Sequence, residues 1–342
     1  MKICFFVRLQ ENTRKERLET LSRIEFYAQD IKILQELGHD VILATRYSEI
    51  PWDADLYYCW WWTFSFMPLW KAKWKGKPLL ITGTFDHILP KGLINYYDRP
   101  LLQRLWLRCS LWLANANVFV SEMEYKSVTE QLGCRNPFYS PHIIYTDEYK
   151  PALEECREEH LIFTVAWLHE VNAKRKGIFE IIRAAALVKK VYPSIQFCIA
   201  GEKSSAYPAL KALVAVLQLE ETVHFLGVIS KEEKIRYLQR CAVYLQPSRF
   251  EGFGVAILEA MACGCPVVTS SVGAIPEVVG DVATLVDCDD VERLAKAIMR
   301  FLADKQAAQE TGRLARERAV RLFHNDRRLH ELKKIMETIT KA

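Results

Sequence analysis

Short apolar runs alternate with longer amphipathic stretches along most of the chain, which is the pattern of parallel α/β layers. In the first half, strands are predicted at residues 3–7, 41–44, 56–59, 79–81 and 118–120, and helices at 21–37, 100–114 and 122–132. Gly38 is placed to end the first helix, and Pro100 suits a first helical turn.

A charged stretch without periodicity, residues 146–160, precedes a second α/β series. Its predicted strands are 161–166, 196–200, 223–226, 242–246, 266–269 and 283–286, and its predicted helices are 178–191, 208–217, 231–240, 255–262 and 291–302. The tail, 306–341, is charged and helical. We therefore expect domains at 1–150 and 151–322 and a C-terminal helix at 323–342. Open parallel sheets bind ligands at the carboxyl ends of their strands.

Composition is that of an ordinary globular protein: 342 residues are 50% hydrophobic and 26% charged, with a net charge of +4 that does not by itself predict nucleic-acid binding. The apolar start is too short for a signal peptide, and uncharged runs such as 56–70 are shorter than the ~20 residues that span a bilayer. Ten cysteines, mostly in apolar segments, favour a reducing cytoplasm. Cys263 and Cys265 lack a neighbouring Cys or His cluster, so no metal site is predicted.

The most informative segment surrounds Glu251. A predicted buried strand ends at Gln246, Glu251 lies in the following turn, and two glycines open a helix that carries Glu259. Glycines let the backbone approach a ligand closely, and the N–H groups of a first helical turn favour a phosphate. The alternative is an amphipathic helix with a capping turn and two solvated carboxylates. Two glutamates around a strand-to-helix turn that contains glycines favour the binding site.

This segment resembles the E-x7-E signature of the retaining glycosyltransferases of family 4, which have the GT-B fold of two facing Rossmann-like α/β domains with a ligand cleft between them. Further matches are Pro276-Glu277-Val278-Val279-Gly280, Gly38-His39-Asp40-Val41, Leu226-Gly227-Val228 and Lys176-Gly177. The resemblance covers nearly all of the second domain and is weaker over the first. It implies an acceptor-side first domain and a donor-side second domain.

The resemblance also implies roles for single residues. Glu251 would hold the donor sugar, Glu259 the ribose, and Lys176 the diphosphate leaving group, with Arg175 as a second candidate cation. Cationic stabilisation of a departing phosphate is chemically required. Most short charge runs such as 174–176 are, by contrast, solvated loops. The remaining donor-site positions would be Gly252, Phe253, Gly254, Val255, Gly201 and Val228.

The sequence departs from the family pattern at two places. Where the family has an arginine after the first strand of domain two, this chain has Ala166-Trp167-Leu168. The first strand-to-helix loop, 8–14, contains none of the usual glycines. The family also places a histidine beside the reacting sugar, and here either Asp86 or His87 could occupy that position.

Other chemistries find less support. Asp53-Ala54-Asp55 precedes a predicted strand, whereas a metal-binding D-x-D follows one. The turns after Val7 and Ala166 lack the G-x-G-x-x-G of dinucleotide enzymes. The prediction is therefore transfer from a UDP- or GDP-linked sugar to a glycan or lipid-linked acceptor, without a cofactor or nucleic acid. Another GT-B enzyme, such as an epimerase or phosphorylase, or a nucleotide-sugar-binding protein with a decayed site, remains the alternative.

The first domain carries an aromatic and basic stretch. Tryptophans at Trp60, Trp61, Trp62, Trp70 and Trp74 are interspersed with Lys71, Lys73, Lys75 and Lys77, and residues 60–108 contain eight Lys or Arg against two Asp or Glu. Such a stretch suits sugar stacking or a lipid headgroup layer. Alternatively, residues 60–62 finish a buried strand and the lysines form a solvated helix face. The expected location is the cytoplasm, with peripheral association at the inner face of a membrane.

Overall fold

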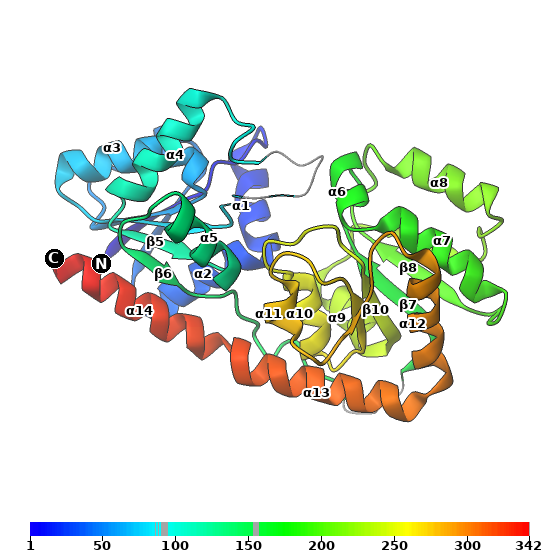
Figure 1. The fold of residues 1–342 in the computed structure, drawn as a ribbon. Coiled ribbons are helices and arrows are strands. Elements are labelled where there is room, and N and C mark those ends of the chain that lie inside the picture. Colours follow the sequence, from blue (N-terminus) through cyan, green and yellow to red (C-terminus); the bar gives the residue numbers. More distant parts are fainter. Residues whose placement is uncertain (86, 88, 90–94, 153–156, 342) are drawn as a thin grey trace. The chain divides into compact units, whose positions relative to one another are not determined.

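The computed structural model describes residues 1–85, 87, 89, 95–152 and 157–341 (Figure 1). These residues fall into two units, Met1–Ile143 with Asn325–Ala342, and Ile144–His324.

The first unit is a parallel sheet with the strand order β2-β1-β3-β4-β5-β6. Its strands are β1 Lys2–Phe6, β2 Asp40–Ala44, β3 Leu56–Trp60, β4 Leu79–Gly83, β5 Ala116–Phe119 and β6 Pro137–Tyr139. Its α-helices are α1 Arg14–Arg23, α2 Glu25–Glu36, α3 Phe66–Lys75, α4 Leu101–Leu113, α5 Glu122–Gln131 and α14 Asn325–Lys341, with short 3-10 turns at Tyr47–Glu49 and Trp62–Phe64. Residues of α3, α4 and α5 share one buried cluster with the sheet, and α2 and α14 pack together.

The helix predicted at 21–37 is two helices. Thr13 starts α1 earlier, through a capping box with Glu16, and α1 ends at Ile24, whose extended backbone (φ −83°, ψ 109°) separates it from α2. β6 has no counterpart in the predicted series, and α3 corresponds only to the alternative in which the lysines lie on a helix. The three residues of β6 lie at the sheet edge, where a short strand leaves little pattern in the sequence.

The second unit has the strand order β12-β11-β10-β7-β8-β9, again parallel. Its strands are β7 Glu158–Val165, β8 Gln196–Ala200, β9 Val223–Gly227, β10 Cys241–Gln246, β11 Val267–Thr269 and β12 Thr284–Leu285. Its helices are α6 Glu170–Arg175, α7 Ile178–Lys189, α8 Tyr207–Val216, α9 Lys231–Arg240, α10 Val255–Ala262, α11 Ile275–Val279, α12 Val291–Ala303 and α13 Lys305–Phe323. Each strand and helix predicted between residues 161 and 302 has an observed counterpart.

Helices cover both faces of this second sheet (Figure 1). Buried residues of α7, α8 and α12 form one apolar cluster with the strands, while α10 packs against α13. The strand order reverses between β7 and β10, because the chain adds β8 and β9 on one side before it returns to add β10. Ligands of open parallel sheets bind at such a reversal, outside the carboxyl ends of the strands.

The predicted helical tail is divided in two. His324, with φ −61° and ψ 147°, ends α13, and α14 then continues as part of the first unit.

Candidate functional site

Two loops meet at the reversal between β7 and β10. The first leads from β7 to α7 and contains Arg175 and Lys176, and the second leads from β10 to α10 and contains Glu251. Arg249 N–H donates to the Arg175 carbonyl at 2.7 Å. Gly177, at φ +69°, lies so close that a Cβ atom there would be 2.4 Å from the Pro247 carbonyl oxygen. The contact between the loops therefore requires glycine at position 177.

Glu251 is buried at the centre of this contact. One carboxylate oxygen accepts hydrogen bonds from Ser248 Oγ at 2.9 Å and Gln246 Nε2 at 3.0 Å. The same oxygen lies 2.8 Å from Lys176 Nζ and 3.1 Å from an Arg175 guanidinium nitrogen. The structure thus brings together the three charged residues that the sequence placed at the donor sugar and diphosphate. Glu251 is a buried ion-pair partner and not a solvated turn carboxylate.

The ion pairs decide the charge states at this position. Burial alone would raise the pKa of Glu251, but the positive charges of Lys176 and Arg175 outweigh it and hold the pKa below its ordinary value. Burial lowers the pKa of Lys176, and Glu251 offsets only part of that effect. The carboxylate is therefore ionised at neutral pH, and an anionic ligand beside Lys176 would strengthen its charged form.

The N-terminus of α10 adjoins Glu251. Its N-cap is Gly254, with φ 99°, and no side chain caps the first turn. N–H groups of the first turn can therefore donate to an anion near Gly252 and Val255. Phe253 is buried, and its ring packs edge-on against Phe323 at 5.8 Å. Phe253 therefore anchors the turn, while Gly252 and Val255 stay partly exposed.

A third segment fixes the backbone of Glu251 from the opposite side. Ala274 N–H donates to the Glu251 carbonyl at 2.9 Å. A Cβ atom on Gly273, at φ +55°, would lie 2.1 Å from the same oxygen. The loop before α11 thus approaches Glu251 at a distance that only glycine permits.

Glu259 lies on the second turn of α10, where it is 3% exposed. The Tyr149 hydroxyl donates to its Oε1 at 3.0 Å, and Lys234 Nζ reaches the same atom at 2.5 Å. Lys234 also lies 5.3 Å from the Tyr149 ring centroid. Sequence reasoning missed Tyr149 and Lys234, as it missed Gln246 and Ser248. Of these four residues, only Ser248 could have been suspected from the sequence, because it is a polar residue three positions before Glu251.

The two remaining donor-side predictions lie at the carboxyl ends of neighbouring strands. Gly201 follows β8 at φ +145°, and a Cβ there would be 1.8 Å from the Ala166 carbonyl oxygen. Val228 follows β9 and is 59% exposed. Both therefore lie at the carboxyl ends of the strands, as the Glu251 loop does, and Gly201 packs directly against the loop after β7.

Of the two acceptor-side candidates, Asp86 lies outside the described residues. His87 belongs to the first unit and is buried; its Nδ1 is 2.8 Å from Ser127 Oγ and its Nε2 is 3.4 Å from the Tyr97 hydroxyl. Burial lowers the pKa of His87, which favours the neutral imidazole. A neutral ring can donate and accept hydrogen bonds at once.

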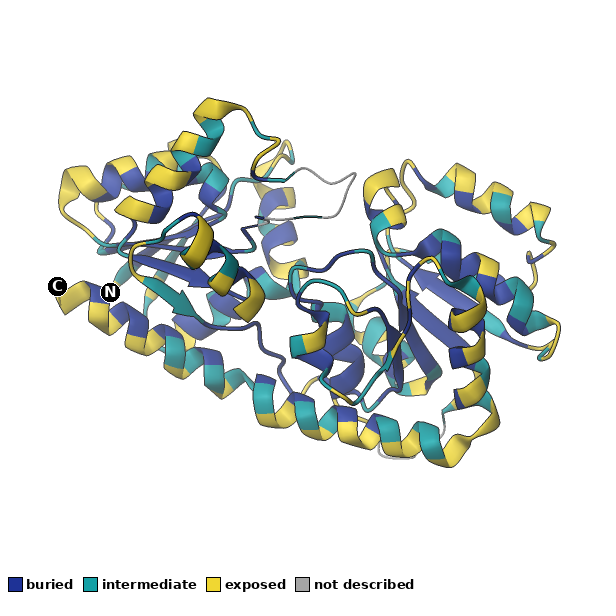
Figure 2. Cartoon of the chain, viewed as in Figure 1, coloured by how far each residue is buried: buried dark blue, intermediate teal, exposed yellow. Residues whose placement is uncertain are grey.

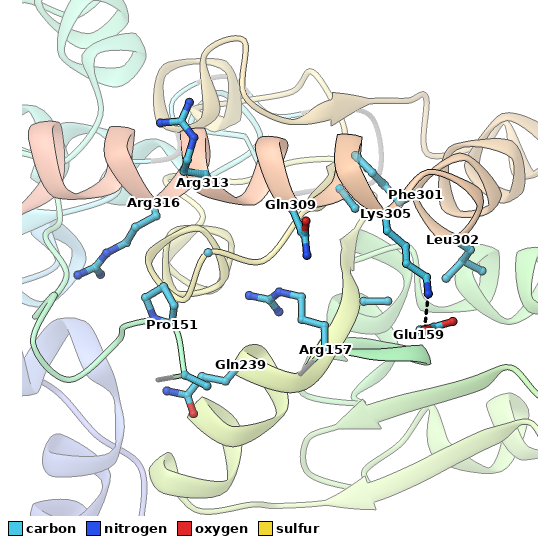
Figure 3. A pocket seen from close by; sticks show the side chains of 14 residues that line it. Pro151, Arg157, Glu159, Gln239, Phe301, Leu302, Lys305, Gln309, Arg313 and Arg316 are labelled. Carbon is cyan, nitrogen blue, oxygen red and sulfur yellow. Dashed lines mark hydrogen bonds and ion pairs between the residues drawn. The ribbon is translucent and has the colours of Figure 1, made fainter. Parts of the chain in front are cut away.

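A separate pocket of about 340 Å³ lies at the start of β7 and β10, on the opposite edge of the second sheet (Figure 3). Its cations already have partners. Arg157 donates to the carbonyls of Leu238, Cys241 and Cys263, at the ends of α9 and α10. Lys305 pairs with Glu159. These side chains stabilise helix ends and strand starts, so we do not assign the donor phosphates to this pocket.

Comparison with known proteins identifies the second unit. A family model described as Glycosyl transferases group 1 matches residues 148–318, half of the chain. The chain is 34% identical over 172 residues to an MMP α-(1→4)-mannosyltransferase of Mycolicibacterium hassiacum, which covers 49% of this chain and 41% of that protein. It is 32% identical over 206 residues to a phosphatidyl-myo-inositol mannosyltransferase of Propionibacterium freudenreichii, which covers 59% and 49%. The matches thus span less than half the length of either relative.

Solved structures agree over the whole chain. Sucrose-phosphate synthase from Thermosynechococcus elongatus superposes with a TM-score of 0.78 at 19% identity, over 99% of both chains. Anabaena Alr3699/HepE, solved with UDP and glucose, gives 0.76 at 17% identity, over 99% of this chain and 100% of that one. At this level of identity the likeness concerns the fold, and it confirms the predicted α/β GT-B class.

Proposed function

The chain belongs to the family of glycosyl transferases group 1, and on this premise we propose that it transfers a hexose from a UDP- or GDP-linked donor to a glycan or lipid-linked acceptor, with retention of the anomeric configuration. The second unit would bind the donor, and the first unit would bind the acceptor. The reaction would need no cofactor.

The observation that carries this proposal is the position of Glu251. Its ionised carboxylate lies at the strand reversal of the second sheet, with Lys176 at 2.8 Å, Arg175 at 3.1 Å and an uncapped helix start beside it. A carboxylate can accept hydrogen bonds from sugar hydroxyls, and two cations with free N–H groups can hold a diphosphate. The arrangement therefore offers matching groups for both halves of a nucleotide sugar.

Each residue would then have a distinct role. Glu251 would hold the donor sugar, and Lys176 and the start of α10 would stabilise the charge that develops on the departing diphosphate. Glu259, fixed by Tyr149 and Lys234, would hold the ribose diol. Gly201 and Val228, at the ends of β8 and β9, would border the nucleotide.

In the family that this chain resembles, an arginine follows the first strand of the donor domain. This chain lacks that arginine, and Arg175 is the candidate to replace it. Its guanidinium donates to the Phe250 carbonyl at 2.9 Å and to Asn172 Oδ1 at 2.7 Å, and these bonds aim it at Glu251. We propose that Arg175 supplies the second cation from the loop that follows the usual position. This supports an active transferase over a binding protein with a decayed site.

On the acceptor side we propose that Asp86 or His87 contacts the reacting sugar. We also propose that the protein acts in the cytoplasm, associated peripherally with the inner face of a membrane. That location would suit a lipid-linked acceptor, whose sugar is presented at the bilayer surface.

Incubation with a panel of UDP- and GDP-sugars, with and without glycan and glycolipid acceptors, tests the function. A transferase releases nucleotide and forms a glycoside only when its acceptor is present, and anomeric proton couplings of the product report retention. An epimerase changes the sugar without acceptor, a phosphorylase requires phosphate, and a binding protein releases nothing. Nucleotide release that persists at the wild-type rate after Glu251→Gln would contradict the proposed site.

A further inference from the structure

Helix α4 exposes an apolar face to solvent. Exposed residues lie along much of α4 (Figure 2). On the face turned away from buried Leu107 and Leu111, these exposed residues are large and apolar, where a helix of a soluble protein usually carries charge. Their exposed fractions range from 46% to 81%, and they are Leu101, Leu102, Leu105, Trp112 and Leu113. A contiguous exposed apolar patch of this kind marks an interaction surface.

Helix α3 extends this surface with aromatic rings. Phe66, Trp70 and Trp74 follow one another at four-residue spacing and are 54%, 45% and 72% exposed. The Phe66 ring packs edge-on against Trp106 of α4 at 5.2 Å, and Trp70 and Trp74 lie 6.2 Å apart. The exposed apolar residues of the two helices therefore form one surface, which we call the α3–α4 face.

The charges within the two helices have one sign. Neither helix contains an Asp or Glu, and the exposed charged residues within them are Lys73, Lys75 and Arg108. Lys71, which the sequence grouped with these lysines, is buried and donates to the Ile50 carbonyl, so it does not contribute. Trp60 and Trp62 are buried as well. The surface thus differs from the one that the sequence suggested, both in its tryptophans and in its leucines.

Apolar side chains on helices that carry cations and no acid match an anionic lipid surface, while the nearby exposed acids Asp53 and Asp98 lie outside both helices. Leucine and tryptophan side chains can enter the boundary between headgroups and acyl chains, while lysine and arginine stay at the phosphates. A contact between two copies of this face would bring the cations of both copies into one interface, and neither α3 nor α4 has an Asp or Glu to pair with them. In the described part of the chain no helix is long and apolar enough to span a bilayer, so the contact would be at the surface.

We propose that the α3–α4 face docks the first unit onto an anionic lipid bilayer, with both helices lying in the headgroup layer. The proposal names the surface by which the peripheral association would occur. It does not rest on the transferase reaction, since the face lies in the first unit and uses none of the donor-site residues.

Vesicle flotation of the full-length protein tests it. We expect binding to vesicles of equal parts phosphatidylcholine and phosphatidylglycerol, little binding to phosphatidylcholine alone, and release as salt rises. The double variant Leu102→Ser/Trp74→Ser should lower the partition coefficient at least about tenfold. The triple variant Lys73→Gln/Lys75→Gln/Arg108→Gln should lower it by about fivefold per charge removed.

Matched changes on α8 provide the control. Val216 is 78% exposed and Lys211 is also exposed, so Val216→Ser and Lys211→Gln remove an exposed apolar side chain and an exposed cation on another helix and should leave flotation unchanged. Thermal unfolding of each variant verifies the fold. Equal flotation of wild type and the double variant would overturn the proposal. The proposal would also be overturned if the variants floated like wild type but no longer formed a dimer, or no longer captured a protein partner.

Discussion

The ammonium group of Lys176 lies 2.8 Å from a carboxylate oxygen of Glu251, and both side chains are largely withdrawn from water. Arg175 reaches the same oxygen, so two cations share one carboxylate. A diphosphate that binds here would meet cations already in position and could draw Lys176 away from Glu251. The freed carboxylate oxygen could then accept sugar hydroxyls. We therefore expect removal of either residue to slow the chemical step.

Replacing Glu251 should abolish most of the activity. We expect Glu251→Gln and Glu251→Ala to lower kcat by ~10²-fold or more, because a contact to the reacting sugar is lost. The Gln variant keeps an oxygen that can accept from Ser248 and Gln246, but it leaves Lys176 and Arg175 without a buried counter-charge, so its unfolding temperature should fall below that of the wild type and rates are compared where both are folded. Glu170→Gln, on the exposed first turn of α6, is the control. Wild-type turnover by either Glu251 variant would refute the assignment.

Replacement of Lys176 and replacement of Glu259 should change different steady-state constants. Charge on the leaving group grows toward the transition state, so Lys176→Ala should mainly lower kcat. A ribose contact is similar in both states, so Glu259→Ala should mainly raise the donor KM and the nucleotide Kd. Calorimetric titration with nucleotide, beside initial rates, checks the difference. The assignment fails if both changes act on nucleotide affinity alone and to the same extent.

The fully buried ion pair between Arg328 and Asp30 should dominate the docking of α14. The Arg328 guanidinium donates to both Asp30 oxygens, at 2.6 and 3.0 Å, and Tyr58 donates to the same carboxylate at 2.6 Å. Removing one partner leaves an unpaired buried charge, so Arg328→Met should cost about 3–5 kcal/mol of unfolding free energy. The neighbouring Arg327, half-buried and paired with Glu331 one helical turn away, is the control.

Arg327→Met should cost only about 1 kcal/mol, since an i,i+4 ion pair that still reaches water and a contact with the Tyr139 ring contribute little. Denaturant unfolding of both variants, followed by circular dichroism, gives the comparison. Equal losses at positions 327 and 328 would show that α14 is held by something other than the Asp30 pair.

The stability of the first unit should depend on pH through Glu49. Burial alone would raise the pKa of this carboxyl, but hydrogen bonds from Thr45, Arg17 and Arg46 outweigh it and lower the pKa to about 2. A lowered pKa in the folded state stabilises the protein fully above the unfolded value, and this stabilisation is lost as pH falls from about 5 toward 2.

Glu49→Gln should therefore lower the unfolding free energy by about 2–3 kcal/mol at pH 7, and the deficit should shrink as the medium is acidified. Urea unfolding of wild type and variant at a series of pH values measures it. A deficit that is the same at pH 3 and pH 7 would mean that the ionised carboxylate is not the stabilising form.

Local signals account for what the sequence predicts well. The helices predicted at 231–240 and 255–262 have the observed bounds, because Ser230 and Glu233 form a capping box at one start and Gly254 marks the other. The strand-to-helix turn that contains Glu251 is predicted for the same reason. Elements whose start lies outside the apolar pattern, such as α1, are predicted poorly.

Tertiary contacts account for what the sequence does not show. Tyr149 meets Glu259 from 110 residues away, and no spacing rule connects them. Lys71 lies in a run of lysines that reads as a solvated face, yet its Nζ lies 4.6 Å from the Trp52 ring centroid and bonds to the Ile50 carbonyl. The aromatic ring and carbonyl that hold this ammonium come from the segment before β3. Such partners become visible only when the chain is folded.

Activity should survive the removal of divalent metal. Many phosphate-transfer sites use a metal ion to balance leaving-group charge. Here Lys176, Arg175 and the first turn of α10 already place positive charge beside Glu251. We therefore expect initial rates with excess EDTA to equal those with Mg²⁺ or Mn²⁺. The Lys176→Ala variant is informative in the same assay. If a metal partly restored its rate, the Lys176 ammonium would be shown to stabilise the leaving-group charge that a metal ion stabilises in other enzymes. If EDTA abolishes wild-type activity and Mg²⁺ or Mn²⁺ restores it, the protein cations do not suffice, and the role given to Lys176 is wrong.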